Sequence, residues 1–350
     1  MEPHPPSASD PILVWGAGAI GGTIAAYLAR AGVPVKLVDV VEAHVAACRT
    51  DGLRIEGAVD NFTQRIPAAT PAEVEGVYSR ILLAVKAQHT QAALDSLLPH
   101  LAVDGYILSA QNGLNEIVIA ERAGAARTVG CYLGFGADWV GPGQIRYGGR
   151  GEVVIGELDG TSRPRTVELH RLLTLFEPNA ILTENIWGYL WSKLGLAAML
   201  FATALNNEGM DVNIGDPQRF PVFDALGREV MAVASARGVT PVGFTNFDPL
   251  AFMPGSPEAA ARTAVATLSK RWQDNAKKHS GFWRDLAVRK RRTEVDFLVG
   301  AVADLGRESG VDTPTIRTLV GLIHDIEEGR RQQSWDTFRI LLDESNARAA

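Results

Sequence analysis

The feature that most constrains this chain is a glycine pattern near its start, between an apolar run and a helix-like segment. The run Ile12–Trp15 leads directly into Gly16, Ala17, Gly18, Ala19, Ile20 and Gly21. In a strand–turn–helix unit the first glycine permits the tight turn, the second lets the backbone approach a pyrophosphate, and the third allows close helix–strand packing. Free N–H groups at the start of the next helix also favour phosphate. The pattern therefore predicts a dinucleotide-binding turn at residues 16–21 and a helix over residues 22–30.

An acidic residue stands where such a turn needs one. A second apolar run, Val35–Val38, is followed directly by Asp39. A carboxylate at the end of the second strand accepts a hydrogen bond from a ribose 2′-OH in this type of unit. The alternative is a glycine-rich strand–helix turn without a ligand, and the correct context on both sides of the motif argues against it.

Composition limits the class of protein. The chain has 350 residues, of which 46% are apolar, so it can form two or three domains with sizeable cores. Its formal net charge of −6 argues against a general nucleic-acid binder. The two cysteines, Cys48 and Cys131, form no disulfide framework and lack metal-site spacing, which fits a reducing cytoplasm. The start lacks the features of a signal peptide, and the longest apolar run, residues 194–205, is too short to span a bilayer.

Hydrophobic periodicity divides the chain into two parts. In the first, apolar runs alternate with helical patterns, which predicts βαβ units and a parallel sheet, with hairpins between residues 132 and 156. From about residue 185 onward helical periodicity dominates. We therefore expect an α/β protein: a disordered leader at residues 1–10, a Rossmann-type dinucleotide-binding domain at 11–184, and an all-helical substrate and dimerisation domain at 185–350. The expected strands are Ile12–Trp15, Val35–Val38, Ile81–Val85, Tyr106–Ser109, Thr128–Leu133, Ile145–Tyr147, Val153–Ile155 and Ala180–Thr183, and the expected helices are Gly22–Arg30, Ala43–Arg49, Gln91–Leu98, Glu116–Ala123, Arg163–Phe176, Ile186–Leu205, Gln218–Arg237, Glu258–Thr267, Arg292–Leu305 and Thr313–Glu327.

Polar groups follow two further predicted strands. Lys86 comes directly after Ile81–Val85, and Asn112 follows Tyr106–Ser109 within Gln111-Asn112-Gly113. Ligands of open α/β sheets bind outside the carboxyl ends of the strands, so both side chains are expected to share a crevice with the glycine turn, where Asn112 is expected to bond the cofactor or, as a catalytic residue, to orient a reacting group. Taken singly, Lys86 also suits a solvated strand end, and Asn-Gly is a common turn.

The second part of the chain offers two further candidates. Lys193 stands at the head of the most apolar helical run, where a lysine either reaches solvent or is held in a site. Glu294 stands at the opening of another amphipathic helix, where an acid is favoured by the helix dipole alone.

In combination, these pieces resemble the ketopantoate reductase family, the 2-dehydropantoate 2-reductases. The resemblance covers nearly the whole chain and keeps the family order. It is carried by Gly16-Ala17-Gly18-Ala19-Ile20-Gly21, Lys86 with Gln88, Gln111-Asn112-Gly113, Trp191-Ser192-Lys193-Leu194, and Thr293-Glu294-Val295-Asp296.

The resemblance implies a reaction and roles for these residues. It implies a reductase of a 2-oxo acid in which Lys193 protonates the carbonyl oxygen as hydride arrives from a nicotinamide. It implies that Glu294 helps to hold the substrate and that Asn112 and Lys86 lie near the cofactor. It also implies a homodimer. A positioned ammonium suits this chemistry, because hydride transfer to a ketone develops negative charge on oxygen.

The chain departs from the family at the substrate face. The family carries asparagines one and two turns after the lysine, and here these positions are Ala197 and Phe201. Together with Phe282 and Trp283, Phe201 indicates a more apolar pocket, suited to another 2-oxo acid. The alternative is that these aromatic residues belong to the core.

Cofactor preference is a second departure. The family mostly uses NADPH and meets its 2′-phosphate with an arginine at the position of Val40. Asp39 would repel that phosphate and accept from a 2′-OH, so the residues favour NAD(H), whereas the family favours NADP(H).

Other functions remain as alternatives. The loss of the two asparagines fits a catalytically inactive dinucleotide-binding sensor, although a sensor would need neither Lys193 nor Glu294. A hydroxyacyl or opine dehydrogenase on the same architecture would need a catalytic histidine, and none stands at the expected place. The seven histidines are scattered, so no metal site is predicted. The cluster Arg289–Arg292 is expected to be a solvated face that attracts anionic substrates.

Overall fold

The computed structural model describes residues 10–244, 247–273 and 278–349, with the side chains of 348 and 349 excepted. The chain forms two compact units that divide between Ile186 and Trp187. Each unit is described by itself. The leader predicted at residues 1–10 lies outside the described residues except for Asp10, whose carboxylate accepts a hydrogen bond from the Ser79 N–H at 3.3 Å.

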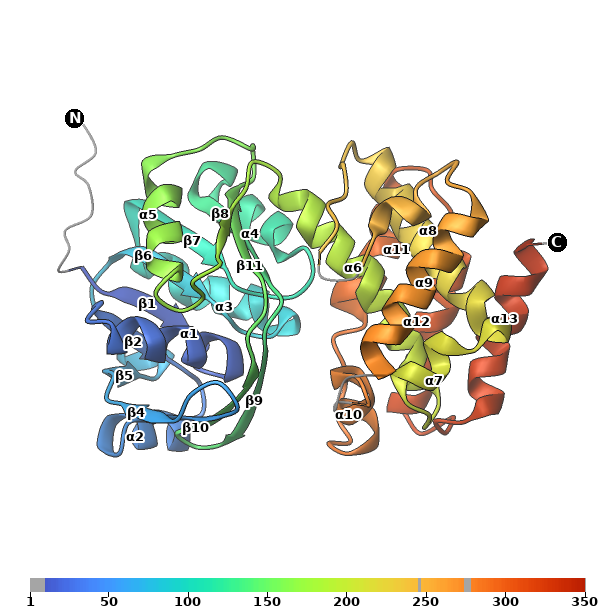
Figure 1. Ribbon diagram of the computed structural model, residues 1–350. Coiled ribbons are helices and arrows are strands. Elements are labelled where there is room, and N and C mark those ends of the chain that lie inside the picture. Colours follow the sequence, from blue (N-terminus) through green and yellow to red (C-terminus); the bar gives the residue numbers. More distant parts are fainter. Residues whose placement is uncertain (1–9, 245–246, 274–277, 350) are drawn as a thin grey trace. The chain divides into compact units, whose positions relative to one another are not determined.

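The first unit is built around an eight-stranded sheet (Figure 1) with the order β12-β11-β8-β7-β6-β1-β2-β5. Counted from the β5 edge, its first six strands, β5-β2-β1-β6-β7-β8, follow the strand order 3-2-1-4-5-6 of dinucleotide-binding sheets. All neighbours pair in parallel except β11, which runs antiparallel to β8. The α/β class is therefore confirmed. The strands are β1 (Ile12–Trp15), β2 (Val35–Val38), β5 (Ala68–Ala69), β6 (Tyr78–Leu83), β7 (Leu101–Ser109), β8 (Thr128–Leu133), β11 (Val153–Glu157) and β12 (Ile181–Leu182).

Two apolar layers cover this sheet, because successive side chains of a strand point to opposite faces. In β1, Val14 packs into a layer with α1 (Ala19–Arg30) and α5 (Pro164–Leu173). Its neighbours Leu13 and Trp15 pack on the other face with α3 (Thr90–Leu97) and α4 (Asn115–Ala123). Both faces of β1 are buried, which explains its continuous apolar sequence.

A second sheet, which the sequence did not predict, packs against α1. Its order is β4-β3-β10-β9, with strands β3 (Leu53–Gly57), β4 (Phe62–Gln64), β9 (Gly136–Gly141) and β10 (Gln144–Gly149). The predicted hairpin region is confirmed, since β9 and β10 pair antiparallel. Ile145 of β10 comes so close to α1 that a Cβ at Gly22 would lie 2.5 Å from its Cδ1 atom. The sheet therefore covers the helix that begins at the glycine turn.

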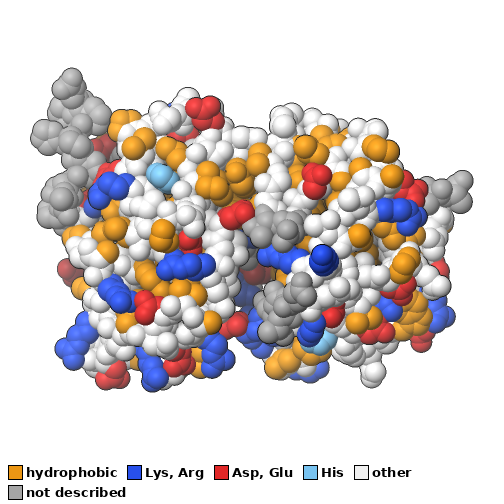
Figure 2. All heavy atoms as spheres, in the orientation of Figure 1, with side chains coloured by type: hydrophobic (Ala, Val, Ile, Leu, Met, Phe, Trp, Pro, Cys, Tyr) orange, Lys and Arg blue, Asp and Glu red, His pale blue; other side chains and the backbone are white. Residues whose placement is uncertain are grey.

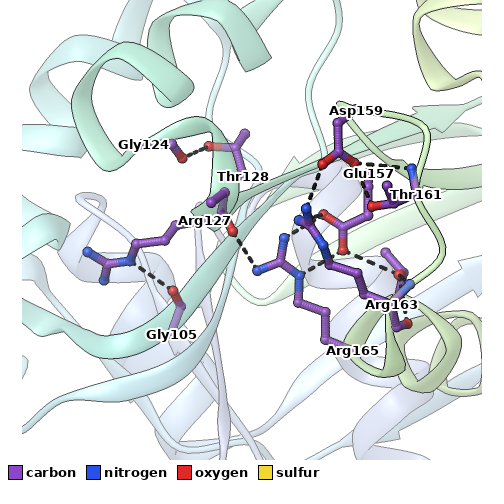
Figure 3. Close-up of polar contacts among 11 residues, drawn as sticks. Gly105, Gly124, Arg127, Thr128, Glu157, Asp159, Thr161, Arg163 and Arg165 are labelled. Carbon is purple, nitrogen blue, oxygen red and sulfur yellow. Dashed lines mark hydrogen bonds and ion pairs between the residues drawn. The ribbon is translucent and has the colours of Figure 1, made fainter. Parts of the chain in front are cut away.

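A cluster of buried charged side chains surrounds Glu157, the last residue of β11 (Figure 3). The Glu157 side chain is 1% exposed and pairs with Arg163 at 3.0 Å and with Arg165. Glu157 lies beside Val129, at the start of β8, because β11 runs antiparallel. The cluster thus lies where the parallel strands begin, away from their carboxyl ends. Removal of its arginine partners would leave the Glu157 charge buried and unpaired, which is strongly destabilising.

Paired charges are also frequent on the surface. On the face shown in Figure 2, basic and acidic side chains are interspersed over the first unit. Arg30 pairs with Asp60, and Arg122 pairs with Asp95 at 2.6 Å. Exposed pairs of this kind contribute little to stability.

The second unit is helical, as predicted (Figure 1). Apart from a bridge between Phe244 and Phe247, its described residues contain no β-pairing. Fully buried side chains of α8, α12 and α13, including Phe223, Leu319 and Phe338, form its core. The helices are α6 (Ile186–Ala202), α7 (Met210–Gly215), α8 (Phe220–Ala236), α9 (Glu258–Gln273), α10 (Gly281–Ala287), α11 (Ala301–Glu308), α12 (Pro314–Glu327) and α13 (Trp335–Ala349).

Two helix predictions need correction. Helix α6 begins at Ile186, as predicted, so Lys193 lies in its middle and not at its head. Glu294 precedes its helix: a π-helical turn, Asp296–Gly300, comes first and α11 follows it. The carbonyl of Glu294 accepts the hydrogen bonds that start this turn, from the N–H groups of Phe297 and Leu298.

Helix α6 is the most apolar of the described helices. With the turn after it, Ile186–Leu205 is long and apolar enough to cross a membrane, and 83% of its most apolar window is buried inside the protein. A buried core helix of a globular protein has the same length and composition, so this segment is weak evidence for a membrane span.

Candidate functional site

The glycine turn has the geometry that a pyrophosphate requires. Gly16 has φ +101°, and a Cβ there would lie 2.8 Å from the backbone of Ala84, which directly follows the neighbouring strand β6. A Cβ at Gly21 would lie 2.1 Å from the Gly16 oxygen, so this glycine permits close helix–strand packing. At Gly18, by contrast, no described atom lies within 4 Å of an added Cβ. The turn is thus tightly packed at Gly16 and Gly21 and open at Gly18, which lies at the N-terminus of α1, where an anion is favoured.

Asp39 is tied to this turn. Its Oδ2 accepts a hydrogen bond from the Ala17 N–H at 3.0 Å, and its Oδ1 accepts one from Val41 at 2.9 Å. The carboxylate is half-buried, while Val40 beside it is 76% exposed. Asp39 therefore both orders the turn and brings a negative charge next to it.

The nearby cation Arg49 is held elsewhere. Its Nη2 pairs with Glu73 at 2.7 Å, and its Nε donates to the Ala68 carbonyl at 2.6 Å. Hydrogen bonds from Arg49 and from Thr70 lower the pKa of Glu73 to about 2, so this partner stays ionised at neutral pH. Arg49 is thereby directed toward Glu73.

A buried amide network joins the loops that carry Lys86 and Asn112. Gln111 Nε2 donates to the Val85 carbonyl and to Thr90 Oγ1, both at 2.8 Å. Thr90 in turn donates to Asn115 at 2.9 Å, and Asn115 donates to the Asn112 carbonyl at 2.6 Å. Gln111 and Thr90 are buried, so this network fixes both loops relative to each other.

The structure brings the predicted residues of the first unit together along one edge. The turn at Gly16, Lys86 and Asn112 follow β1, β6 and β7, which are adjacent parallel strands. Lys86 is half-buried, and the Asn112 side chain is exposed. The sequence did not single out Thr90 or Asn115 as supports of this edge. The only local signal for them is that each is a polar residue within six positions of the end of a predicted strand, because the partners of Thr90 lie 21 and 25 residues away.

In the second unit, Lys193 is half-buried on the predominantly apolar helix α6. Its neighbour Ser192 is fully buried, donates to the Gly188 carbonyl at 2.7 Å and accepts from the Val242 N–H at 3.1 Å. These two hydrogen bonds hold the turn of α6 that carries Lys193 in place.

The helix face that carries Lys193 continues into apolar residues. Ala197 and Phe201 follow at intervals of four residues, which places them on that face. Phe201 is fully buried and stacks on half-buried Phe282 at 3.6 Å between ring centroids, with an interplanar angle of 11°. Trp283 instead stacks on His279 at 3.9 Å. Phe201 is thus a core residue, and Phe282 forms its outer cover.

Glu294 is buried on a segment that is held by a second polar network. Both the N–H and the hydroxyl of Thr293 donate to Glu327 Oε1 at 2.7 Å. The other Glu327 oxygen lies 3.1 Å from His324, whose second ring nitrogen lies 2.7 Å from Asp296. The network fixes the backbone on both sides of Glu294, which is 8% exposed. The sequence analysis did not identify Glu327 or His324.

No group of three or more metal-ligating side chains occurs among the described residues.

The fold and these residues define a Rossmann-type, two-unit oxidoreductase. The model of the family described as "Ketopantoate reductase PanE/ApbA" matches residues 12–160, and that of its C-terminal part matches residues 185–327. The chain therefore belongs to the ketopantoate reductase family and is an oxidoreductase that acts on CH–OH groups.

Individual relatives agree with this assignment. The chain is 27% identical over 335 residues to the 2-dehydropantoate 2-reductase of Mesorhizobium japonicum, with 89% of this chain and 96% of that protein covered. It is 28% identical over 320 residues to that of Halobacterium salinarum, with coverages of 89% and 97%.

Solved structures show the same fold. A ketopantoate reductase of Ralstonia eutropha superposes with a TM-score of 0.73 at 27% identity, covering 91% of this chain and 98% of that one. A D-mandelate dehydrogenase superposes with a TM-score of 0.79 at 21% identity, with the same coverages.

Proposed function

We propose that this protein is an NAD(H)-dependent reductase of a 2-oxo acid. The observation that carries the proposal is the glycine turn, which is packed at Gly16 and Gly21 and open at Gly18, beside the Asp39 carboxylate. These residues fit a dinucleotide: the open position suits the pyrophosphate, and Asp39 suits a ribose 2′-OH. Residues 16–21, Asp39, Lys86 and Asn112 would hold the cofactor.

Lys193 is the proposed general acid. The nicotinamide supplies a hydride when bound. The Lys193 ammonium stabilises the negative charge that develops on the carbonyl oxygen and donates a proton to it, which gives the 2-hydroxy acid. Its place on an apolar helix strengthens this interaction, because a charge acts over longer range where water is excluded.

The substrate side chain is proposed to be apolar. Ala197 and Phe201 stand one and two turns beyond Lys193 on α6, neither side chain carries a polar group, and half-buried Phe282 covers Phe201. These residues offer no hydrogen bonds to a hydroxylated chain, while a bulky aliphatic or aromatic group would gain about 25 cal/mol per Å² of buried apolar surface.

A panel of 2-oxo acids tests this function. Turnover of ketopantoate and of aromatic 2-oxo acids such as phenylpyruvate would be measured with NADH and with NADPH separately. We expect the highest kcat/KM with an apolar 2-oxo acid and NADH. Tight dinucleotide binding without turnover of any panel member would support the sensor alternative instead.

The cofactor preference gives a quantitative prediction. A 2′-phosphate next to Asp39 meets like-charge repulsion, and no cation stands at position 40. About 1.4 kcal/mol of repulsion produces tenfold discrimination, so we expect kcat/KM to favour NADH by about tenfold or more. The measurement compares both cofactors at matched ionic strength, because salt screens the repulsion.

A paired variant tests the cause of that preference. Asp39→Asn keeps an oxygen for the Ala17 N–H but removes the charge, and Val40→Arg adds a cation; together they should shift the preference toward NADPH. The single variant Arg49→Gln is the control and should leave the ratio unchanged. A wild-type preference for NADPH that Arg49→Gln abolishes would show that Arg49 leaves Glu73 to bind the phosphate.

Glu294 is proposed to accept a hydrogen bond from the substrate hydroxyl of the 2-hydroxy acid. Hydrogen bonds to charged groups contribute about 1.5–3 kcal/mol, so Glu294→Gln should raise KM for the hydroxy acid by roughly tenfold or more and leave dinucleotide affinity unchanged. Glu308→Gln, at an exposed site of α11, is the matched control. If Glu294→Gln lowers only the melting temperature, the residue has a purely structural role.

A further inference from the structure

A buried histidine connects the glycine turn to the second sheet. His44, on α2 (Glu42–Thr50), is 1% exposed. Its Nε2 lies 2.8 Å from the Ala17 carbonyl oxygen within the turn. Its Nδ1 lies 2.9 Å from the backbone nitrogen of Gly143, at the tip of the β9–β10 hairpin, and 3.4 Å from Trp139 Nε1.

These partners fix the tautomer of the ring. The N–H groups of Gly143 and Trp139 are donors only, so Nδ1 must accept and carries no proton. The Ala17 carbonyl is an acceptor only, so Nε2 must carry the proton and donate. His44 is therefore held as the neutral Nε2–H tautomer.

The bond to Ala17 sets the direction of a neighbouring donor. A trans peptide unit is planar, with its C=O and the next N–H pointing in opposite directions. Because the Ala17 carbonyl points at His44, the Gly18 N–H points away from it. Gly18 caps α1 and has open space around its Cα, so this N–H belongs to the donors available to an anion.

Two side chains thus hold Ala17 from both ends. Asp39 accepts from its N–H, and His44 donates to its carbonyl. His44 in turn depends on the hairpin, since Gly143 packs closely enough that a Cβ there would lie 2.9 Å from the Cβ of Ala47 on α2. The His44 side chain thereby links the β9–β10 hairpin of the second sheet to the glycine turn.

We propose that His44 is a positioning residue for dinucleotide binding, which orients the Gly18 N–H toward the pyrophosphate through the Ala17 carbonyl. The proposal rests on the proposed function, because it concerns the same cofactor loop. It adds a residue outside the glycine motif and gives the β9–β10 hairpin a part in cofactor binding.

Two isosteric variants separate the two hydrogen bonds of the ring. In His44→Gln, the amide nitrogen replaces Nε2 and can still donate to Ala17, while the bond from Gly143 is lost. In His44→Asn, the amide oxygen replaces Nδ1 and can still accept from Gly143, while the bond to Ala17 is lost. His44→Gln thus loses the bonds from Gly143 and Trp139, and His44→Asn loses only the bond to Ala17, so weaker nucleotide binding by His44→Asn alone would assign the effect to the Ala17 carbonyl.

The test is calorimetric titration of the full-length protein with NADH and with ADP-ribose, together with melting temperatures. We expect His44→Asn to weaken the binding of both by about tenfold or more, His44→Gln to bind within about threefold of wild type, and both to melt at lower temperature. In turnover, His44→Asn should raise KM for the cofactor and leave kcat at saturation nearly unchanged. Equal affinities for the two folded variants would overturn the proposal.

A measurement on the unsubstituted protein covers the case in which either variant does not fold. The ring ¹⁵N resonances of labelled His44 should show a protonated Nε2 and an unprotonated Nδ1, and the reverse tautomer would overturn the proposal. Failure of the wild type to bind either nucleotide would refute the dinucleotide function itself, whereas normal wild-type binding with unaffected His44→Asn would refute only the role of His44.

Discussion

Replacing Lys193 by methionine is expected to lower kcat by a factor of about 10² to 10⁴, the usual contribution of a general acid. Methionine keeps an unbranched apolar stem at this half-buried position of α6, so the helix should keep its packing. Dinucleotide affinity should stay at the wild-type value, because the residues proposed to bind it lie in the first unit. The measurement is steady-state turnover with the best 2-oxo acid, combined with calorimetric titration of NADH.

The matched control for this variant is Lys270→Met. Lys270 is an exposed lysine of α9 in the same unit, so its loss removes one positive charge without touching α6. A Lys193→Met enzyme within a few-fold of wild-type kcat would exclude the proton-donor role and return Lys193 to a lysine that merely reaches solvent.

Gly18→Val is expected to weaken dinucleotide binding by on the order of 100-fold while the protein stays folded. Gly18 has φ −68° and ψ −161°, a conformation open to any L-residue, and no described atom lies within 4 Å of the added Cβ. The side chain would therefore meet only the bound pyrophosphate, and forced overlap of this kind costs about 1–3 kcal/mol. Titration with NADH and circular dichroism together measure the effect.

Two further glycine variants serve as comparisons for Gly18→Val. Gly18→Ala adds a smaller group at the same open position and should weaken binding by less than valine does. Gly21→Ala should instead lower the melting temperature, because its Cβ would lie 2.1 Å from the Gly16 oxygen. If Gly18→Val binds NADH as tightly as the wild type does, the cofactor does not lie against this turn.

The main sheet was accessible to prediction because its strands are buried on both faces. Strands β1, β2 and β8 were predicted with their observed bounds, since each is a mostly apolar run. The second sheet was not predicted, apart from its hairpin. Its strand β3 alternates buried apolar and polar residues, but it has only five residues, and its partner β10 lies about 90 residues further along the chain, so the local sequence does not reveal the pairing.

Of the residues in the candidate site, some were likewise predicted from the sequence and others were not. Lys86 and Asn112 were predicted to share an edge because each follows a recognisable strand, and the order of β6 and β7 places them there. His44 and Glu327 escaped notice because their partners are distant in sequence: His44 accepts from a residue 99 positions away, and Glu327 from one 34 positions away. A single histidine or glutamate in a helix carries no trace of such a partner.

The location of the Glu157 cluster bears on how this protein can change under selection. The cluster lies where β8 begins, and β8 has six residues, so about 20 Å separates it from the edge that carries the cofactor loops. Substitutions at such separations have additive effects on the free energy of unfolding. Changes in cofactor or substrate preference at one edge can therefore accumulate without loosening the charge cluster at the other, and a destabilised but altered enzyme could be rescued by substitutions at the far edge alone.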